Sequence, residues 1–115
     1  MHIPANNKKE LGLKIKGQRE KERLSLRKVA SRCEISPAAL SDIENGIIFP
    51  TEKTFLRILD AINHTNKPEI CDLYGELKST VPPDVASYLI NNRQAVEGIR
   101  LLMTQEQREQ DEPFE

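Results

Sequence analysis

The sequence predicts an all-α protein, and three observations lead to that prediction. Aromatic residues make up only 4% of the chain, against 30% charged and 37% hydrophobic residues, a balance that suits helical bundles with cores of Leu, Ile, Val and Ala. Apolar residues recur every three or four positions, and no segment alternates as a strand does. Proline, glycine and asparagine interrupt these periodic segments at short intervals. At 115 residues the chain has room for one domain with a modest appendage.

The first periodic segment predicts a helix over residues 10–23, after a polar stretch at residues 1–9 that we expect to be flexible. Leu11, Ile15 and the aliphatic stem of Arg19 are spaced four residues apart, so they lie on one face of that helix. This face is predicted to point into the core.

Two short helices follow, over residues 25–33 and 36–45, and each begins with a serine. Serine is a preferred N-cap residue because its hydroxyl accepts a hydrogen bond from a free amide of the first turn. Pro37 strengthens the second start, since proline is tolerated at the first helical position. Asn45 and Gly46 are expected to end that helix.

Four further helices are predicted after the Phe49-Pro50-Thr51 loop. They are marked by the apolar residues of segments 55–62, 70–77, 85–89 and 96–103, separated by breaks at residues 64–68, 82–83 and 91–92.

Charge divides unevenly along the chain, although the net charge is only −1. Residues 1–66 carry twelve Lys and Arg against eight Asp and Glu, whereas residues 67–115 carry five against ten. The first part can therefore approach a phosphate backbone, and the second would be repelled by one.

The two cysteines, Cys33 and Cys71, form no CxxC motif, and two histidines are too few for a zinc site. We expect two buried, reduced thiols rather than a disulfide, and no metal or other cofactor. The sequence has no signal peptide and no apolar run of membrane-spanning length, so a cytoplasmic location without membrane contact is expected.

The most informative feature is the pair of short helices at 25–33 and 36–45, joined by a tight turn. An α-helix fits the major groove of B-DNA, and a second helix braced across it sets its angle and contacts phosphates. Such a crossing needs small residues, and Ala30 is suitably located.

These helices and their flanks resemble the Xre/Cro/CI-type helix-turn-helix family over roughly half of the chain, in order and without gaps. The residues that carry the resemblance are Leu11, Gly12, Ile15, Arg19, Ser25, Val29, Ala30, Ile35, Ser36, Leu40, Ser41, Ile43, Glu44, Gly46, Pro50 and Leu56. The resemblance implies a five-helix, lambda-repressor-like domain with further C-terminal helices. It also implies that Arg19 pairs with Glu44, although two solvated surface charges are the alternative reading.

The resemblance further assigns DNA contacts to the third helix, which would enter the major groove. Base-contacting candidates are Pro37, Ala38, Ser41 and Asp42. Candidates for phosphate contact are Arg27, Lys28, Ser36 and Asn45, with Lys14 and Lys53 as weaker ones. Asp42 is equally open to being a solvated charge that phosphates repel.

Three features of the sequence depart from the family pattern. Glu34 occupies a turn position that is usually glycine, so a residue with a side chain is expected at positive φ. Residues 46–49 replace a loop that commonly carries Lys or Arg, and Ile47 and Ile48 either pack inside or present an apolar patch. Glu52 stands where an apolar residue is usual.

The chain is thus divided into a flexible N-terminus (1–9), a helix-turn-helix domain (10–66), a helical dimerisation or regulatory segment (67–105) and an acidic tail expected to be disordered (106–115). In the third part, helices that only extend the core are the alternative to a dimer. The candidate interface residues are Val85, Leu89, Val96, Ile99 and Leu102. The segment around Val81 to Leu89 also resembles the C-terminal part of short repressors of mobile elements, some of which a companion metalloprotease inactivates.

The predicted function is sequence-specific binding of double-stranded DNA by a homodimeric transcriptional regulator of bacterial or phage type, acting as a repressor. The alternative is a protein-binding module of the same fold, such as an antitoxin or adaptor, whose partner would be a toxin, an antirepressor or a protease. An enzyme is not expected, because the histidines lack triad partners and no glycine-rich phosphate loop is present.

Overall fold

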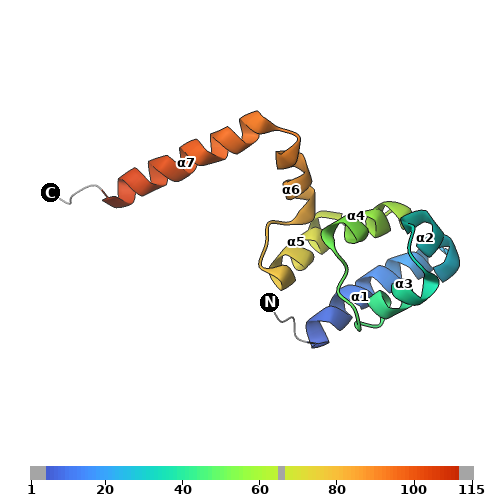
Figure 1. The fold of residues 1–115 in the computed structure, drawn as a ribbon. Helices are drawn as coiled ribbons and strands as arrows, with labels where there is room; N and C mark the ends of the chain where they lie inside the picture. The colour runs from blue at the N-terminus through green and yellow to red at the C-terminus, as the bar shows by residue number, and fades with distance from the viewer. Residues whose placement is uncertain (1–4, 65–66, 112–115) are drawn as a thin grey trace. The chain divides into compact units, whose positions relative to one another are not determined.

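The computed structural model describes residues 5–64 and 67–111, and in these ranges the chain forms seven α-helices and no β-strand (Figure 1). The predicted all-α class is therefore confirmed. The helices are α1 (Ala5–Lys21), α2 (Leu26–Cys33), α3 (Pro37–Glu44), α4 (Glu52–Ala61), α5 (Lys67–Lys78), α6 (Pro83–Ile90) and α7 (Arg93–Asp111).

The chain divides into two compact units, Met1–Asp84 and Val85–Glu115. The first holds five helices, α1 to α5, as the family resemblance implied. The first compact unit therefore extends beyond residue 66, where the helix-turn-helix domain is expected to end, and includes α5. The reason is burial: Ile70, Cys71 and Tyr74 of α5 are 2% exposed or less and belong to the same core as the first four helices.

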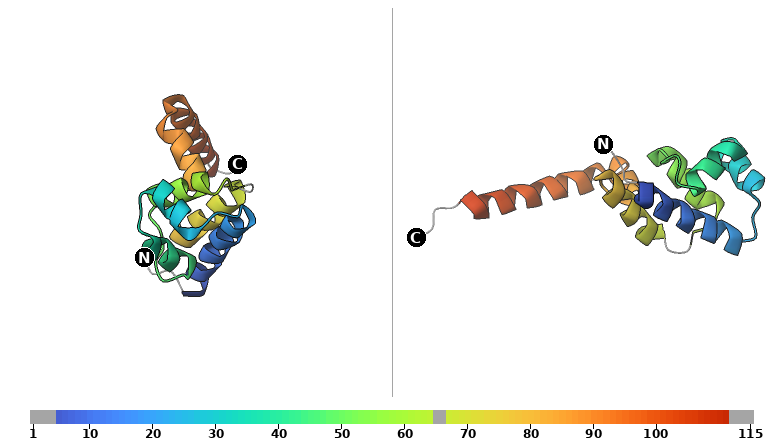
Figure 2. Two further views of the ribbon diagram at one scale, coloured as in Figure 1. Left: turned by 90° about the vertical axis from the view of Figure 1, so that its right-hand side faces the viewer. Right: turned by 90° about the horizontal axis from the view of Figure 1, so that it is seen from below.

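In the first unit, α1 packs against α3 and α5, while α2 packs against α3 and α4 (Figures 1 and 2). The approach of α1 to the end of α3 requires a glycine. A Cβ atom added at Gly12 would clash with the backbone carbonyl oxygens of Ile43 and Glu44. The core that these helices enclose consists of Leu11, Ile15, Val29, Ala30, Cys33, Leu40, Ile43, Phe55, Ile58, Leu59, Ala61, Ile62, Ile70, Cys71 and Tyr74.

Two helix ends differ from the sequence prediction. Helix α1 begins at Ala5, inside the segment 1–9 that was expected to be flexible, and α7 continues to Asp111, inside the predicted acidic tail at 106–115. The α7 extension, residues 106–111, consists almost entirely of Glu, Gln and Arg, and these residues favour helix even where no apolar stripe marks it. The α1 extension contains Ala5, Lys8 and Lys9, which also favour helix, together with two asparagines, which do not. Residues 1–4 and 112–115 of those two predictions lie outside the described residues.

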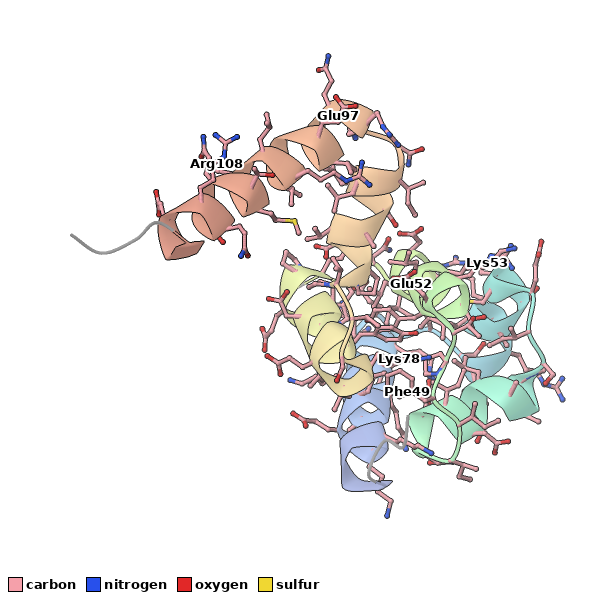
Figure 3. The ribbon with its side chains drawn as sticks, turned by 60° about the vertical axis from the view of Figure 1, so that its left-hand side comes forward. Phe49, Glu52, Lys53, Lys78, Glu97 and Arg108 are labelled. Atoms are coloured by element: carbon pink, nitrogen blue, oxygen red, sulfur yellow. The ribbon has the colours of Figure 1, made fainter. Side chains whose placement is uncertain are left out.

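An aromatic cluster joins α5 to the loop that follows α3. Tyr74 stacks on Phe55 with ring centroids 4.5 Å apart, and Phe49 lies 4.9 Å from Tyr74. The Tyr74 hydroxyl donates a 2.9 Å hydrogen bond to the Pro50 carbonyl oxygen. Lys78 Nζ lies 5.7 Å from the centroid of the Phe49 ring (Figure 3). Helix α5 therefore fixes the second half of this loop.

The first half of the same loop is exposed. Ile47 and Ile48 are 65% and 44% exposed. These two residues therefore form an apolar surface patch and do not pack into the core. Phe49 instead packs against the core.

The second unit contains most of α6 and all of α7, joined by Asn91 and Asn92 as predicted. The side-chain amide of Asn92 donates to the Tyr88 carbonyl oxygen at 2.8 Å, which closes the end of α6. Several large apolar side chains of this unit are exposed, namely Val85, Tyr88, Ile90, Ile99, Leu101, Leu102 and Met103. In the part of the chain that the structure describes, no helix is long and apolar enough to cross a membrane.

Candidate nucleic-acid interface

The turn between α2 and α3 is closed by capping residues at both helices. The Ser25 hydroxyl accepts a 3.1 Å hydrogen bond from the Lys28 amide, and the Ser36 hydroxyl accepts one of the same length from the Ala39 amide. Glu34 ends α2 with φ of +59°, so the prediction of a non-glycine residue in left-handed conformation is confirmed. These caps fix the angle between the two helices.

Helix α3 is divided into an inner and an outer face. Leu40, Ile43 and Glu44 are buried against the rest of the domain. The other face points outward, with Pro37, Ala38 and Asn45 exposed and Ser41 and Asp42 partly exposed. All four candidate base-contacting residues therefore share the accessible face of one helix, and Asn45 extends that face by one turn.

The inner face is held to α1 by an ion pair between Arg19 and Glu44. Arg19 Nε donates to Glu44 Oε2 at 2.7 Å, and the second terminal nitrogen of Arg19 donates to Glu44 Oε1 at 3.0 Å. The remaining terminal nitrogen donates to the Leu24 carbonyl oxygen at 2.9 Å. The two side chains are 13% and 3% exposed, so the pair is not a solvated surface contact. The hydrogen bonds to Glu44 raise the pKa of Arg19 above its ordinary value, and burial opposes them.

A residue that the sequence analysis missed, Lys9, lies beside the end of α3. Gly46 has φ of +75°, and a Cβ atom added there would lie 2.8 Å from the Lys9 backbone. Lys9 and Leu13 of α1 also line a pocket of about 310 Å³ together with Glu44 and Asn45. Because residues 1–9 were expected to precede the first helix, no contact with α3 was anticipated. Lys9 lies three residues before Gly12, so a helix that begins at Ala5 places both residues on the side of α1 that faces the end of α3.

The cationic candidates for phosphate contact are distributed over several helices. Arg27 and Lys28 are exposed in the first turn of α2, and Lys53 is exposed in the first turn of α4 (Figure 3). Lys14 instead lies 3.8 Å from Glu69 of α5. Helix α3 itself contains no lysine or arginine.

The two polar candidates for phosphate contact already have partners within the protein. Ser36 caps α3 through its hydroxyl, as described above. The side-chain amide of Asn45 donates a 3.3 Å hydrogen bond to the Ser41 hydroxyl oxygen.

The arrangement of α2, its tight turn and α3 agrees with the comparison of the sequence with known families. Residues 10–65 match the family model described as a helix-turn-helix domain. The helix-turn-helix is a DNA-binding motif whose second helix lies in the major groove. The match identifies the domain without assigning it to a subfamily. Searches of curated proteins and of solved structures each found no significant match to the chain.

Both cysteines are buried and free, so the predicted buried thiols are confirmed. Burial raises the pKa of Cys33 and of Cys71, which makes both thiols poor nucleophiles. Among the described residues, no group of three or more His, Cys, Asp or Glu side chains is arranged to hold a metal ion.

Proposed function

We propose that this chain is a transcriptional regulator of the Xre/Cro/CI type that binds double-stranded DNA sequence-specifically and acts as a repressor. One observation carries the proposal: the helix-turn-helix match coincides with a helix, α3, whose inner face is fixed by a buried ion pair and whose outer face is accessible. A recognition helix needs both properties, because bases are read only by side chains held in a defined position.

In this proposal α3 enters the major groove, and its outer face contacts the bases. Ala38 packs against a thymine methyl group, and the Asp42 carboxylate accepts from the amino group of cytosine or adenine. Arg27 and Lys28 contact phosphates from α2, and Lys9 does so from α1 beside the end of α3. Affinity and base reading therefore come from different helices.

The second unit supports a dimer in this proposal. Val85, Ile99 and Leu102 are each more than 40% exposed, and Leu89 and Val96 are partly buried. A second copy that covers these side chains would bury apolar surface that a lone chain leaves in water. Two-fold symmetry would also match two half-sites about one helical turn of DNA apart.

A protein-binding module is the second candidate, and two observations favour it. Ile47 and Ile48 form an exposed apolar patch next to α3, and no cation lies on α3 itself. A toxin or another regulatory protein would be the partner in that case.

The experiment that separates the two is a binding titration of the full chain, with the DNA upstream of its own gene and with random DNA. Phosphate contacts make affinity fall steeply with salt, and specific binding exceeds random binding by roughly a thousandfold or more. Lys28→Ala should weaken binding to both DNAs alike. Lys14→Ala is the matched control, because Lys14 faces Glu69 of α5, and it should weaken binding less.

Sedimentation of the free protein in the same buffers tests the dimer. If neither DNA binds at low salt, the proposed function is wrong and the domain serves as a protein-binding scaffold.

A further inference from the structure

The outer face of α3 contains a hydrogen bond that sets the chemistry of one base-facing residue. Asn45 Nδ2 donates to Ser41 Oγ at 3.3 Å, one helical turn away. A serine hydroxyl has one hydrogen to donate and two lone pairs that accept. With one lone pair occupied by Asn45, the hydroxyl hydrogen points away from the Asn45 amide and is left to donate to another partner.

We propose that Asn45 is a positioning residue that makes Ser41 a hydrogen-bond donor toward DNA, so that Ser41 favours guanine or thymine over cytosine at the base it faces. This inference rests on the proposed function and deepens it.

The preference follows from the edges that bases present in the major groove. Guanine offers only acceptors there, N7 and O6, and thymine offers O4, whereas cytosine offers only its amino donor. Against cytosine the Ser41 hydrogen would be left without a partner in a desolvated interface, and an unmade hydrogen bond costs more than a made one gains. Adenine presents both an acceptor and a donor and is not discriminated.

Asp42 makes the preference directional. Its carboxylate only accepts, and it stands next to Ser41 on the same face of α3. The neighbouring positions therefore differ in hydrogen-bond sense, with a donor at Ser41 and an acceptor at Asp42. A base step that offers an acceptor to the first and an amino group to the second satisfies both.

The fold tolerates changes at Asn45, because its side chain is exposed. Asn45 directly follows the last residue of α3, and its φ of −86° is one that any residue can adopt. Aspartate has nearly the same shape but only accepts. In Asn45→Asp the Ser41 hydroxyl would donate to the new carboxylate, which leaves only lone pairs for the base. In Asn45→Ala the hydroxyl is free to rotate.

The test is selection of bound sequences from a pool of random double-stranded DNA by the full chain, followed by competition between single-base variants of the selected site. Ser41→Ala identifies the base that Ser41 faces, since discrimination is lost at that position alone. There the wild-type protein should favour guanine or thymine over cytosine by about five- to tenfold. Asn45→Ala should reduce this ratio toward one, and Asn45→Asp should reverse it in favour of cytosine.

Affinity for random DNA distinguishes this role from a phosphate contact. A positioning residue acts on one base, so Asn45→Ala should change the base preference at that position more than it changes the affinity for random DNA. If Asn45→Ala instead weakens specific and random binding alike and keeps the base preference, Asn45 is a phosphate contact and the inference is wrong. An unchanged preference in Asn45→Asp, with helical content intact by circular dichroism, would also overturn it. If the wild-type protein binds no DNA, the proposed function fails first.

Discussion

Replacing Glu44 with alanine would leave the Arg19 guanidinium buried with only the Leu24 carbonyl oxygen as a partner. Removing one partner of a buried ion pair typically costs about 3–5 kcal/mol, because the remaining charge loses its compensation. Arg19 keeps one hydrogen bond and is 13% exposed, so we expect the lower end, about 3 kcal/mol. A unit the size of Met1–Asp84 is stable by roughly 4–13 kcal/mol, so this loss is a large share of the total.

Urea unfolding followed by circular dichroism measures the effect, and the matched control is Asp60→Ala. Asp60 lies 3.6 Å from Lys67, but its side chain is 76% exposed, and such surface pairs contribute about 1 kcal/mol or less. Glu44→Ala should therefore lower the free energy of unfolding by at least about 2 kcal/mol more than the control, with the denaturant slope unchanged.

A double replacement sharpens the test. Buried ion pairs are often no more stabilising than apolar residues of similar size, so Arg19→Met combined with Glu44→Met should recover much of the stability that either single change loses. The reasoning is refuted if Glu44→Ala costs no more than Asp60→Ala, or if the two methionine changes simply add.

Two further predictions concern the backbone of the turn and the aromatic cluster. Glu34→Gly should raise the free energy of unfolding by about 0.5–1 kcal/mol, because glycine adopts φ of +59° without the steric cost that Glu34 bears. The exposed ion pair between Glu34 and Arg57, which this change removes, contributes little to stability. If urea unfolding shows no gain of Glu34→Gly over Glu34→Ala, this prediction is contradicted. Burial, and secondly the Glu52 carboxylate, raise the pKa of Tyr74 to about 12, above the value near 10 in an unfolded chain. The stability that the neutral phenol contributes is therefore fully present below pH 10 and is lost as the pH rises toward 12. Ultraviolet titration should show a tyrosine ionisation near pH 12 that Tyr74→Phe removes, and its persistence in the variant would disprove the assignment.

The features that local sequence encodes were predictable. Ser25 and Ser36 mark helix starts because a hydroxyl at that position satisfies free amides, whatever the rest of the fold is. The positive φ of Glu34 was expected because the family that the sequence resembles usually has glycine at this turn position. The family resemblance supplied the pairing of Arg19 with Glu44, which no local rule predicts, since 25 residues separate them.

The features that depend on tertiary packing were not predictable from local patterns. Ile70 and Tyr74 show the same apolar spacing whether their helix joins the first unit or the second, so the apolar pattern alone does not place α5 in the first core. Lys9 was missed because helix propensity without an apolar stripe gives a weak signal. The hydrogen bond from Asn45 to Ser41 depends on the rotamers of two side chains on the outer face of α3, and the sequence pattern does not specify these rotamers.

The clash that any side chain at Gly12 would meet has a consequence for redesigning this protein. Helix α1 lies directly on the last carbonyl groups of α3. The position and tilt of α3 are therefore set by residues on its inner side, which do not face a ligand. The residues on the outer face of α3 can therefore be substituted together without moving the helix. A library randomised at residues 37, 38, 41, 42 and 45 should yield mostly folded proteins that differ in what they recognise.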